Sequence, residues 1–356
     1  MALFGKKKTI LGVDIGHDQL KLALVDDGVV IAAASAAMPE NLLRDGELTS
    51  LDTMSDLIKQ TMKENNIKAN HAALVLPNES VYVKNVSVPM MTTDQLAYNL
   101  PFEFNDYITG EVSDYIFDYA VLPKEDNGEE DDQAGEKQAD ADPFLQEEEE
   151  PIESLELMAV GAPNSIITES QSMLRKAGLR MVKTAPALCT YISLIRKQKD
   201  TLMQEYEEFG ILDLGYNSIR MYMYKGDRHV ATRVLEIGLR SLDSVIADIY
   251  GVEVHLAHTY LMANFDKCLE KEECMNSFEN IAVELMRAMN FYRFSNPDST
   301  MTDMWLCGGG AVIRPLTDAI GEMLDMRLHT ASELVIGGDD IPECNSFVQA
   351  IGITMD

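Results

Sequence analysis

Two stretches of this sequence are copies of one pattern, and together they decide its fold. Residues 11–22 read LGVDIGHDQLKL, and residues 210–221 read GILDLGYNSIRM, at a constant offset of 199 residues without a gap. Each copy is an apolar strand ending in Asp-apolar-Gly, then a short polar turn, then a second strand with one basic residue, Lys21 or Arg220. A repeated supersecondary unit of this kind predicts two similar halves.

The segments around these copies alternate between strand and helix patterns. Each copy is followed by a turn and a third strand, at 29–35 and 229–237. Apolar spacing at three and four predicts helices, and short apolar runs predict further strands. The expected helices cover 53–64, 93–105, 164–177, 187–198, 239–249, 253–263 and 278–294, and the expected strands cover 72–76, 81–88 and 304–307. Strands mixed with helices around a duplicated hairpin core indicate an α/β fold with insertions.

Composition limits the class of partner. The 356 residues include 29 Lys plus Arg and 59 Asp plus Glu, a formal net charge of −30. Nucleic acid is therefore not an expected partner, because its phosphates are bound by clustered basic residues. The 46% of apolar residues is typical of a folded protein. No stretch approaches the roughly 20 apolar residues of a membrane span, the N-terminus lacks a secretory pattern, and the five scattered cysteines indicate reduced thiols. These features predict a cytoplasmic protein.

The negative charge is concentrated in one segment. Residues 124–153 hold 14 acidic residues and 2 lysines, a net charge of −12. Such a segment cannot bury enough apolar surface to offset its chain entropy, so we expect a disordered loop. The strand-like runs at 115–122 and 155–160 on either side indicate an insertion at the tip of a hairpin.

The repeated motif suits phosphate chemistry. Glycines at the turns, Gly16 and Gly215, let backbone N–H groups approach a phosphate. Asp14 and Asp213 at the strand ends are candidate Mg²⁺ ligands through water, and Lys21 is a candidate phosphate partner. The turn of the second copy adds the polar candidates Asn217 and Ser218. The alternative is that each motif is only a tight turn, and the paired register favours the phosphate interpretation.

A third glycine-rich element follows the strand at 304–307. Gly308, Gly309 and Gly310 stand between this strand and an apolar helix, an arrangement that favours an anionic ligand at the helix N-terminus. A dinucleotide-binding fingerprint is excluded because Gly-x-Gly-x-x-Gly is absent. Upstream, Glu284 and Arg287 lie one helical turn apart, where they would contact a ribose and an adenine or simply form a solvated ion pair.

These residues carry a family resemblance. The two Asp-apolar-Gly hairpins and the glycine turn resemble the phosphate and adenosine motifs of the actin/Hsp70/sugar-kinase ATPases, whose fold is ribonuclease H-like and duplicated. The chain resembles more specifically the PilM family of type IV pilus assembly, within the FtsA-like superfamily. The resemblance covers nearly the whole chain, and its most specific parts are AVGAP at 159–163 and KAGL at 176–179.

The resemblance implies a two-lobe actin-like ATPase with an inserted extra subdomain. The boundaries it implies are 1–88 for the first part of the first lobe, 89–180 for the extra subdomain, 181–205 for the lobe connection and 206–356 for the second lobe, with a helical subdomain near 251–300. It also implies ATP with Mg²⁺ in the cleft, with Gly238 among the binding residues.

The resemblance further implies a role as a scaffold that links an inner-membrane platform to the cytoplasmic pilus motor. The partner it implies is the N-terminal cytoplasmic tail of PilN, with contact to motor ATPases and homo-oligomers as further possibilities, so that the protein lies at the inner face of the membrane only through partners. The tail-binding groove is expected at Leu96, Leu100, Phe104 and Tyr107, which follow helical spacing. For each of these side chains, packing in the subdomain core is the alternative.

The sequence departs from the family pattern at three places. His17-Asp18-Gln19 replaces the usual Ser or Thr of the first turn, and an Asp there repels phosphate unless metal intervenes. Gly238 is followed by Leu239 and not by a second glycine. Residues 184–188 offer no carboxylate or amide to orient water. Asp213 remains the water-positioning candidate, and we expect slow hydrolysis or none.

Three other functions remain as alternatives. A small-molecule kinase of the same fold would need a carboxylate base and a larger second lobe. An FtsA-like filament protein would end in a basic amphipathic helix, whereas residues 350–356 contain no basic residue, and a related secretion-system adaptor is the third. A metal site at Cys268 and Cys274 with His255 and His258 is also conceivable, but its spacing is wrong for a zinc knuckle.

Overall fold

The computed structural model describes residues 9–44, 46–108, 110–122, 154–202, 206–226 and 228–355. The chain divides into two compact units. Unit 1 holds the chain up to Glu79 and from Glu169 onward, and unit 2 is Ser80–Thr168. The predicted acidic loop at 124–153 lies outside the described residues.

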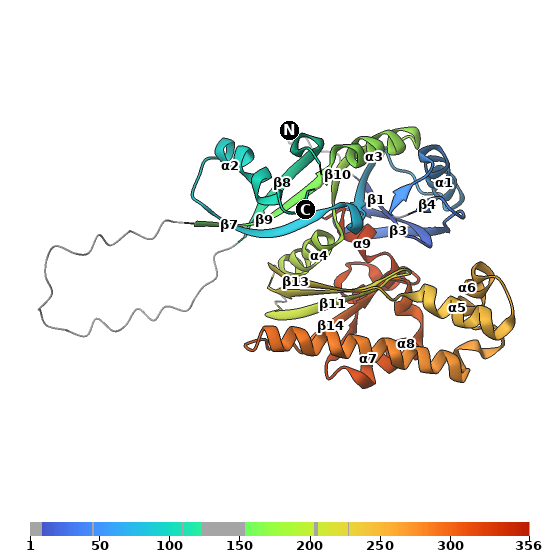
Figure 1. The fold of residues 1–356 in the computed structure, drawn as a ribbon. Helices are drawn as coiled ribbons and strands as arrows, with labels where there is room; N and C mark the ends of the chain where they lie inside the picture. The colour runs from blue at the N-terminus through green and yellow to red at the C-terminus, as the bar shows by residue number, and fades with distance from the viewer. Residues whose placement is uncertain are drawn as a thin grey trace, which may run out of the picture. The chain divides into compact units, whose positions relative to one another are not determined.

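Unit 1 contains two five-stranded sheets of the same design (Figure 1). In the first, β1 (Ile10–Ile15) and β2 (Gln19–Asp26) form an antiparallel hairpin, β3 (Val29–Ala37) follows antiparallel, and β6 (His71–Leu76) and β10 (Arg180–Pro186) are parallel to β1. In the second, β11 (Glu208–Leu214), β12 (Ile219–Lys225) and β13 (Arg228–Leu235) are antiparallel, and β14 (Asp303–Cys307) and β15 (Arg327–Thr330) are parallel to β11. The predicted duplication is confirmed.

The first sheet and its helices, here called the first lobe, have a core on one face. Helix α1 (Leu51–Glu64) begins at Ser50, whose side chain accepts from the Thr53 N–H at 3.2 Å. Its buried Met54 and Ile58 are four residues apart, so both meet the sheet. Helix α3 (Asn164–Lys176) adds Met173 and Leu174 to the same core. Fully burying side chains of this size contributes about 1.5–3 kcal/mol each.

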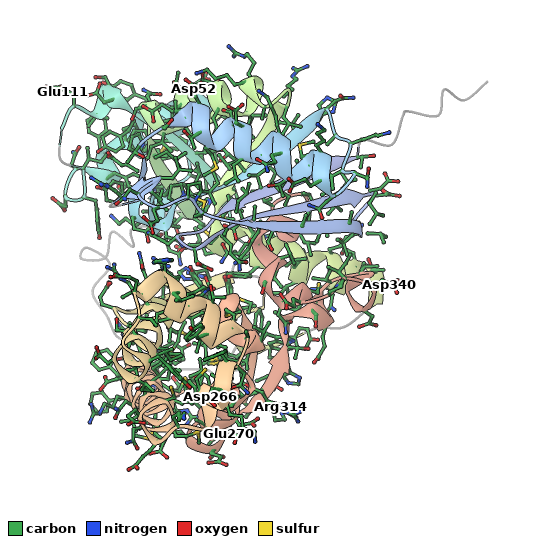
Figure 2. All side chains as sticks on the ribbon, turned by 90° about the vertical axis from the view of Figure 1, so that its right-hand side faces the viewer. Asp52, Glu111, Asp266, Glu270, Arg314 and Asp340 are labelled. Atoms are coloured by element: carbon green, nitrogen blue, oxygen red, sulfur yellow. The ribbon has the colours of Figure 1, made fainter. Side chains whose placement is uncertain are left out.

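The second sheet and its helices form the second lobe. Helices α5 (Leu239–Tyr250), α7 (Glu272–Ser295) and α8 (Arg314–Met323) bury their apolar stripes against one face of the sheet, and Figure 1 shows α7 and α8 lying along it. Helix α6 (Val254–Met262) and the 3₁₀ segment η4 (Phe265–Glu270), which carries Asp266 and Glu270 (Figure 2), connect α5 to α7.

Helix α4 (Ala187–Leu202) lies between the two sheets (Figure 1). Its Leu188 carbonyl accepts from the Tyr224 hydroxyl of the second sheet at 3.0 Å. Its Ala187 packs with Ala73 and Val75 of the first sheet and with Ile353, just beyond the short helix α9 (Val348–Gly352). The two lobes therefore share one packed layer.

Unit 2 is built on a three-stranded antiparallel sheet, in the order β7-β9-β8. Strands β7 (Tyr82–Pro89) and β8 (Tyr115–Val121) both pair with β9 (Ser154–Pro163). The predicted pairing of the strands on either side of the acidic segment is thus confirmed. Helix α2 (Thr93–Asn99) and the 3₁₀ turns η2 (Leu100–Phe104) and η3 (Val112–Asp114) complete the unit. Because β7 shares this sheet, the unit starts before the boundary at residue 89 implied by the resemblance.

The smaller elements are β4 (Leu43–Arg44), β5 (Glu47–Leu48) and the 3₁₀ turns η1 (Asn78–Ser80), η5 (Gly309–Val312), η6 (Ala331–Leu334), η7 (Gly338–Asp340) and η8 (Cys344–Ser346). Within the described ranges, no helix combines the length and the apolar character needed to cross a bilayer.

Candidate functional site

The turn between β1 and β2 carries the first group of candidate residues. Asp14 is paired in register with Lys21, and the Gly16 N–H donates to the Gln19 carbonyl at 3.0 Å, which closes the turn. The Asp14 residue is only 9% exposed, and the Lys21 Nζ lies 3.9 Å from its Oδ2. The strand end therefore holds a buried carboxylate with one cation beside it.

The turn between β11 and β12 has the same geometry. Asp213 is paired with Arg220, which is the register that Asp14 and Lys21 show in the first lobe. A Cβ on Gly215 would lie 2.6 Å from the Ser218 carbonyl oxygen, so this turn closes only around glycine. Asn217 is exposed, whereas Ser218 is buried.

Asp14 and Asp213 interact with each other electrostatically. Burial raises the pKa of Asp14, the charge of Lys21 opposes this, and the charge of Asp213 adds to it. Burial also raises the pKa of Asp213, which is 6% exposed, while Lys21 and Arg220 oppose it. Two buried carboxylates that share one nearby lysine bind a proton or a cation more readily than isolated ones. This donor set fits Mg²⁺, which usually keeps waters and takes one or two carboxylates plus phosphate oxygens.

Three residues around Asp213 were missed by sequence reasoning. The Gln349 side-chain amide of α9 donates to the Asp213 Oδ2 and to the Tyr191 hydroxyl oxygen, both at 2.8 Å. The Tyr191 hydroxyl also lies 3.3 Å from the Cys307 Sγ. Nothing in the local pattern around Gln349 distinguishes it, because its partner lies 136 residues away.

The third glycine element meets the second turn. Gly308 has a φ of +84°, and a Cβ there would lie 2.5 Å from the Asp213 Oδ1. Gly309 and Gly310 start the turn η5, and Gly310 packs against Leu214. Gly238 precedes α5, whose first N–H groups donate to the Gly215 and Tyr216 carbonyls at 3.1 and 3.0 Å. The structure thus brings the candidate glycines Gly215, Gly238, Gly308 and Gly310 together around the end of β11.

Glu284 and Arg287 lie on α7 and pair with each other. The Arg287 Nη1 is 2.5 Å from the Glu284 Oε1, and both side chains are about half exposed or more. The structure therefore shows the solvated ion pair that the sequence analysis gave as one of two alternatives for these residues.

Two partly buried ion pairs join the first lobe to the second, in addition to an exposed pair of His255 with Glu40 at 3.9 Å. The Arg220 Nη2 lies 2.5 Å from the Oε1 of Glu79, a residue that follows β6. The Arg220 side chain is therefore paired with a carboxylate of the other lobe. His258 on α6 is 3.2 Å from Asp18 in the first turn. Burial lowers the pKa of His17 in the same turn, so this imidazole is expected to be neutral at pH 7. The sequence analysis did not single out Glu79, and it considered His258 only as a metal ligand, because each of these pairings depends on the tertiary fold.

The four partner-binding candidates in unit 2 have different environments. Leu96, Leu100 and Phe104 are buried in the core of the unit, whereas Tyr107 is 51% exposed. The same segment exposes two further aromatic side chains, Tyr98 and Phe102, whose ring centroids are 5.9 Å apart. The Lys84 Nζ lies 5.5 Å from the centroid of the Tyr107 ring.

The alternative cysteine and histidine site is not formed. Cys268 and Cys274 are buried free thiols, and His258 is engaged by two carboxylates. Over the ranges of the chain that the structure describes, no group of three or more Cys, His, Asp or Glu side chains is arranged to hold a metal ion. Asp14 and Asp213 are only two, so an ion there would depend on water and a ligand for its other contacts.

Two sheets of one design, each opened by the same Asp-containing hairpin, define the class of this protein, which has the actin-like ATPase fold. The family model described as "Type IV pilus assembly protein PilM" matches residues 12–134 and 143–335. The chain belongs to the PilM family, and the predicted resemblance is confirmed. This membership places it among type IV pilus assembly proteins.

Solved structures share this fold. A chain in the structure described as "PilM-PilN type IV pilus biogenesis complex" is 20% identical, with a TM-score of 0.74 and 98% of each chain covered. The ethanolamine utilization protein EutJ from Carboxydothermus hydrogenoformans is 12% identical, with a TM-score of 0.58, over 96% of this chain and 88% of its own. No curated protein matches the sequence.

Proposed function

We propose that this chain is an ATP-binding scaffold of type IV pilus assembly that docks the N-terminal cytoplasmic tail of PilN. The nucleotide-binding part of this proposal rests on the two buried carboxylates, Asp14 and Asp213, at equivalent positions of two turns that are closed at a glycine. The charge of Lys21 acts on both carboxylates and opposes the rise in pKa that burial causes in each. Bound Mg²⁺ would supply the positive charge that a triphosphate needs in this acidic chain.

Each candidate residue has a role in this proposal. Asp14 and Asp213 would hold the ion through its water shell, and Lys21 would neutralise a phosphate oxygen. The turns at Gly16 and Gly215, with Asn217 and Ser218, would offer polar groups to the phosphates. The remaining contacts, to the nucleoside and to the outer phosphate, would come from Gly238, Glu284, Arg287, Gly308, Gly309 and Gly310.

The proposal includes slow hydrolysis or none. A water-positioning carboxylate must be free to accept from the attacking water. Asp213 already accepts a hydrogen bond from Gln349, and burial favours its protonated form because it raises the pKa. ATP would then act as a structural or switching ligand.

The docking part is supported by the surface of unit 2. Exposed aromatic side chains that lie together are a common feature of protein interaction sites. Tyr98 and Phe102 are 74% and 56% exposed, and Tyr107 is on the same segment. In this proposal these three contact the tail, while Leu96, Leu100 and Phe104 hold the segment on the sheet from below. The similar solved structure with a TM-score of 0.74 is a complex of PilM with PilN.

The proposal also covers location and assembly. A PilN tail would hold the protein at the inner face of the cell membrane, with no membrane segment of its own required. The proposed scaffold role extends to contact with pilus motor ATPases and to self-association. Nucleic acid is not a proposed partner, since the net charge is −30.

Calorimetric titration of the full chain with a synthetic PilN N-terminal tail, with and without Mg-ATP, tests the docking proposal. We expect saturable binding that weakens at least about tenfold, equal to about 1.4 kcal/mol, in a Tyr98→Ala/Phe102→Ala variant. Phe294→Ala is the matched control, because Phe294 is 86% exposed but lies on α7 in unit 1. Absence of binding in both conditions would remove the docking role.

A further inference from the structure

One histidine contacts both repeated turns. His258 on α6 lies 3.2 Å from the Asp18 Oδ2 through its Nε2, and 3.0 Å from the Asp243 Oδ2 through its Nδ1. Asp18 belongs to the turn of the first lobe, whereas Asp243 lies on α5 of the second. The ring of Tyr216, in the turn of the second lobe, packs edge-on against His258 at 5.5 Å.

The charges of this cluster require a protonated histidine. Both ring nitrogens lie within hydrogen-bond distance of a carboxylate, and only the imidazolium form donates from both. Burial lowers the pKa of His258, but the hydrogen bonds and charges of Asp18 and Asp243 raise it to about 10. Asp243 is fully buried, with an exposure of 0%, so the imidazolium is fixed to the second lobe by a carboxylate shielded from water.

We propose that His258 is a positioning residue that clasps the Asp18 turn of the first lobe to helices α5 and α6 of the second. The residues Asp18, Asp243 and His258 are called the interlobe clasp below. For nucleotide binding, this inference rests on the function proposed above. The inference also gives Asp18 a role that the sequence left open. In this role, the charge of Asp18 is neutralised by a histidine of the opposite lobe.

The clasp has two consequences for the cleft. Asp18 is held toward His258, so its charge is balanced where it would otherwise repel a phosphate. The clasp also limits the separation of the Asp18 turn from helices α5 and α6, because one end of the contact is in each lobe. Together with the Arg220–Glu79 pair, the clasp favours a closed arrangement of the lobes.

Spin-label distances in the nucleotide-free protein test the clasp directly. The labels are placed at Glu64→Cys on α1 and Glu273→Cys on α7, both exposed positions, in a Cys189→Ser background, since the other native thiols are buried. Asp18→Asn and His258→Gln are expected to shift the interlobe distances to longer and broader values, and Asp18→Glu to restore them in part. His329→Gln is the matched control, because His329 is also paired with a carboxylate, Asp303 at 2.7 Å, but both residues lie in the second lobe.

Unchanged distances in both Asp18→Asn and His258→Gln would overturn the clasp. The Asp18→Asn variant is expected to fold normally, because it leaves His258 paired with the buried Asp243. The test therefore does not depend on His258→Gln alone. The measurement needs no nucleotide, so it decides on the clasp even if the proposed ATP binding fails.

A second measurement separates the clasp from simple charge repulsion. The dissociation rate of a fluorescent ATP analogue is expected to rise about threefold to tenfold in Asp18→Asn, as for the loss of one charge-assisted contact of about 0.7–1.4 kcal/mol. If Asp18 acted only by repelling phosphate, the same change would slow dissociation. Slower or unchanged dissociation would therefore contradict the positioning role.

Discussion

The Gln349 side chain donates a 2.8 Å hydrogen bond to the Asp213 Oδ2, so the last helix of the chain holds the carboxylate at the end of β11. The same amide donates to the Tyr191 hydroxyl oxygen on α4. Asp213 is 6% exposed and has little access to water as an alternative partner. This relationship connects α9 and α4, which lie between the sheets, to the candidate nucleotide site.

Replacing Gln349 by Ala is therefore expected to destabilise the fold. The change leaves a buried carboxylate and a buried tyrosine without this partner, which costs about 1–3 kcal/mol of unfolding free energy. Chemical denaturation measures the loss. Gln60→Ala is the control, because Gln60 is exposed on α1, and surface changes stay within about 0.5 kcal/mol. Equal stability of the two variants would contradict a structural role for Gln349.

Asp14→Asn is expected to raise stability slightly when Mg²⁺ is removed by a chelator at pH 8. Burial raises the folded-state pKa of Asp14 above its unfolded value of 3.8, so the ionised carboxylate opposes folding. That penalty is absent below the unfolded pKa and grows as pH rises through the folded pKa. Thermal melts of the chelated protein check the sign. Asp52→Asn, which removes an exposed partner of Lys176, is the control, and a large loss in Asp14→Asn would contradict the burial argument.

Gly308→Ala is expected to lower the stability of the fold far more than Gly178→Ala. Both glycines have a positive φ, of +84° and +83°, so both substitutions pay a similar backbone penalty of about 1–2 kcal/mol. A Cβ at Gly308 would also meet the Asp213 Oδ1 at 2.5 Å, whereas nothing lies within 4 Å of one at Gly178. Denaturation midpoints of the two variants compare these costs. Equal losses would show that the turn at Gly308 adapts.

Histidine titration by nuclear magnetic resonance is expected to give very different pKa values for His258 and His229. The pKa of His258 is raised to about 10 by its carboxylates against the effect of burial, and the pKa of His229 is lowered by burial to about 4. His258 should remain protonated at pH 8, and His229 should remain neutral at pH 6. The stabilisation from His258 is fully present below its unfolded pKa of 6.5 and is lost as pH rises through about 10. Titration of His258 near 6.5 would contradict the described pairing.

Local sequence patterns predicted the repeated parts of the fold. The offset between the two copies appears in the structure as identical registers, Asp14 with Lys21 and Asp213 with Arg220. Hairpin register follows from turn length and alternating apolar residues, both of which are visible in a single sequence. The glycine turn after β14 was also predicted, because three consecutive glycines after an apolar run are visible in a single sequence.

The contacts between lobes could not be predicted in this way. Glu79 and Arg220 are 141 residues apart, and His258 is separated from Asp18 by most of the chain. Whether such side chains meet depends on how helices pack on the sheets, and neither spacing nor composition encodes that. The buried state of Leu96, Leu100 and Phe104 was also open, because one helical spacing serves a core or a groove equally well.

Calorimetric titration of Mg-ATP into the full chain tests the central claim, that Asp14 and Asp213 form a magnesium-dependent nucleotide site. Asp14→Asn and Asp213→Asn keep the shape of each side chain and remove one negative charge. We expect saturable binding to the native protein, weakened at least about tenfold in each variant and by chelation of Mg²⁺. Equal affinity in the native protein, in both variants and without Mg²⁺, or no binding to the native protein at all, would contradict the claim.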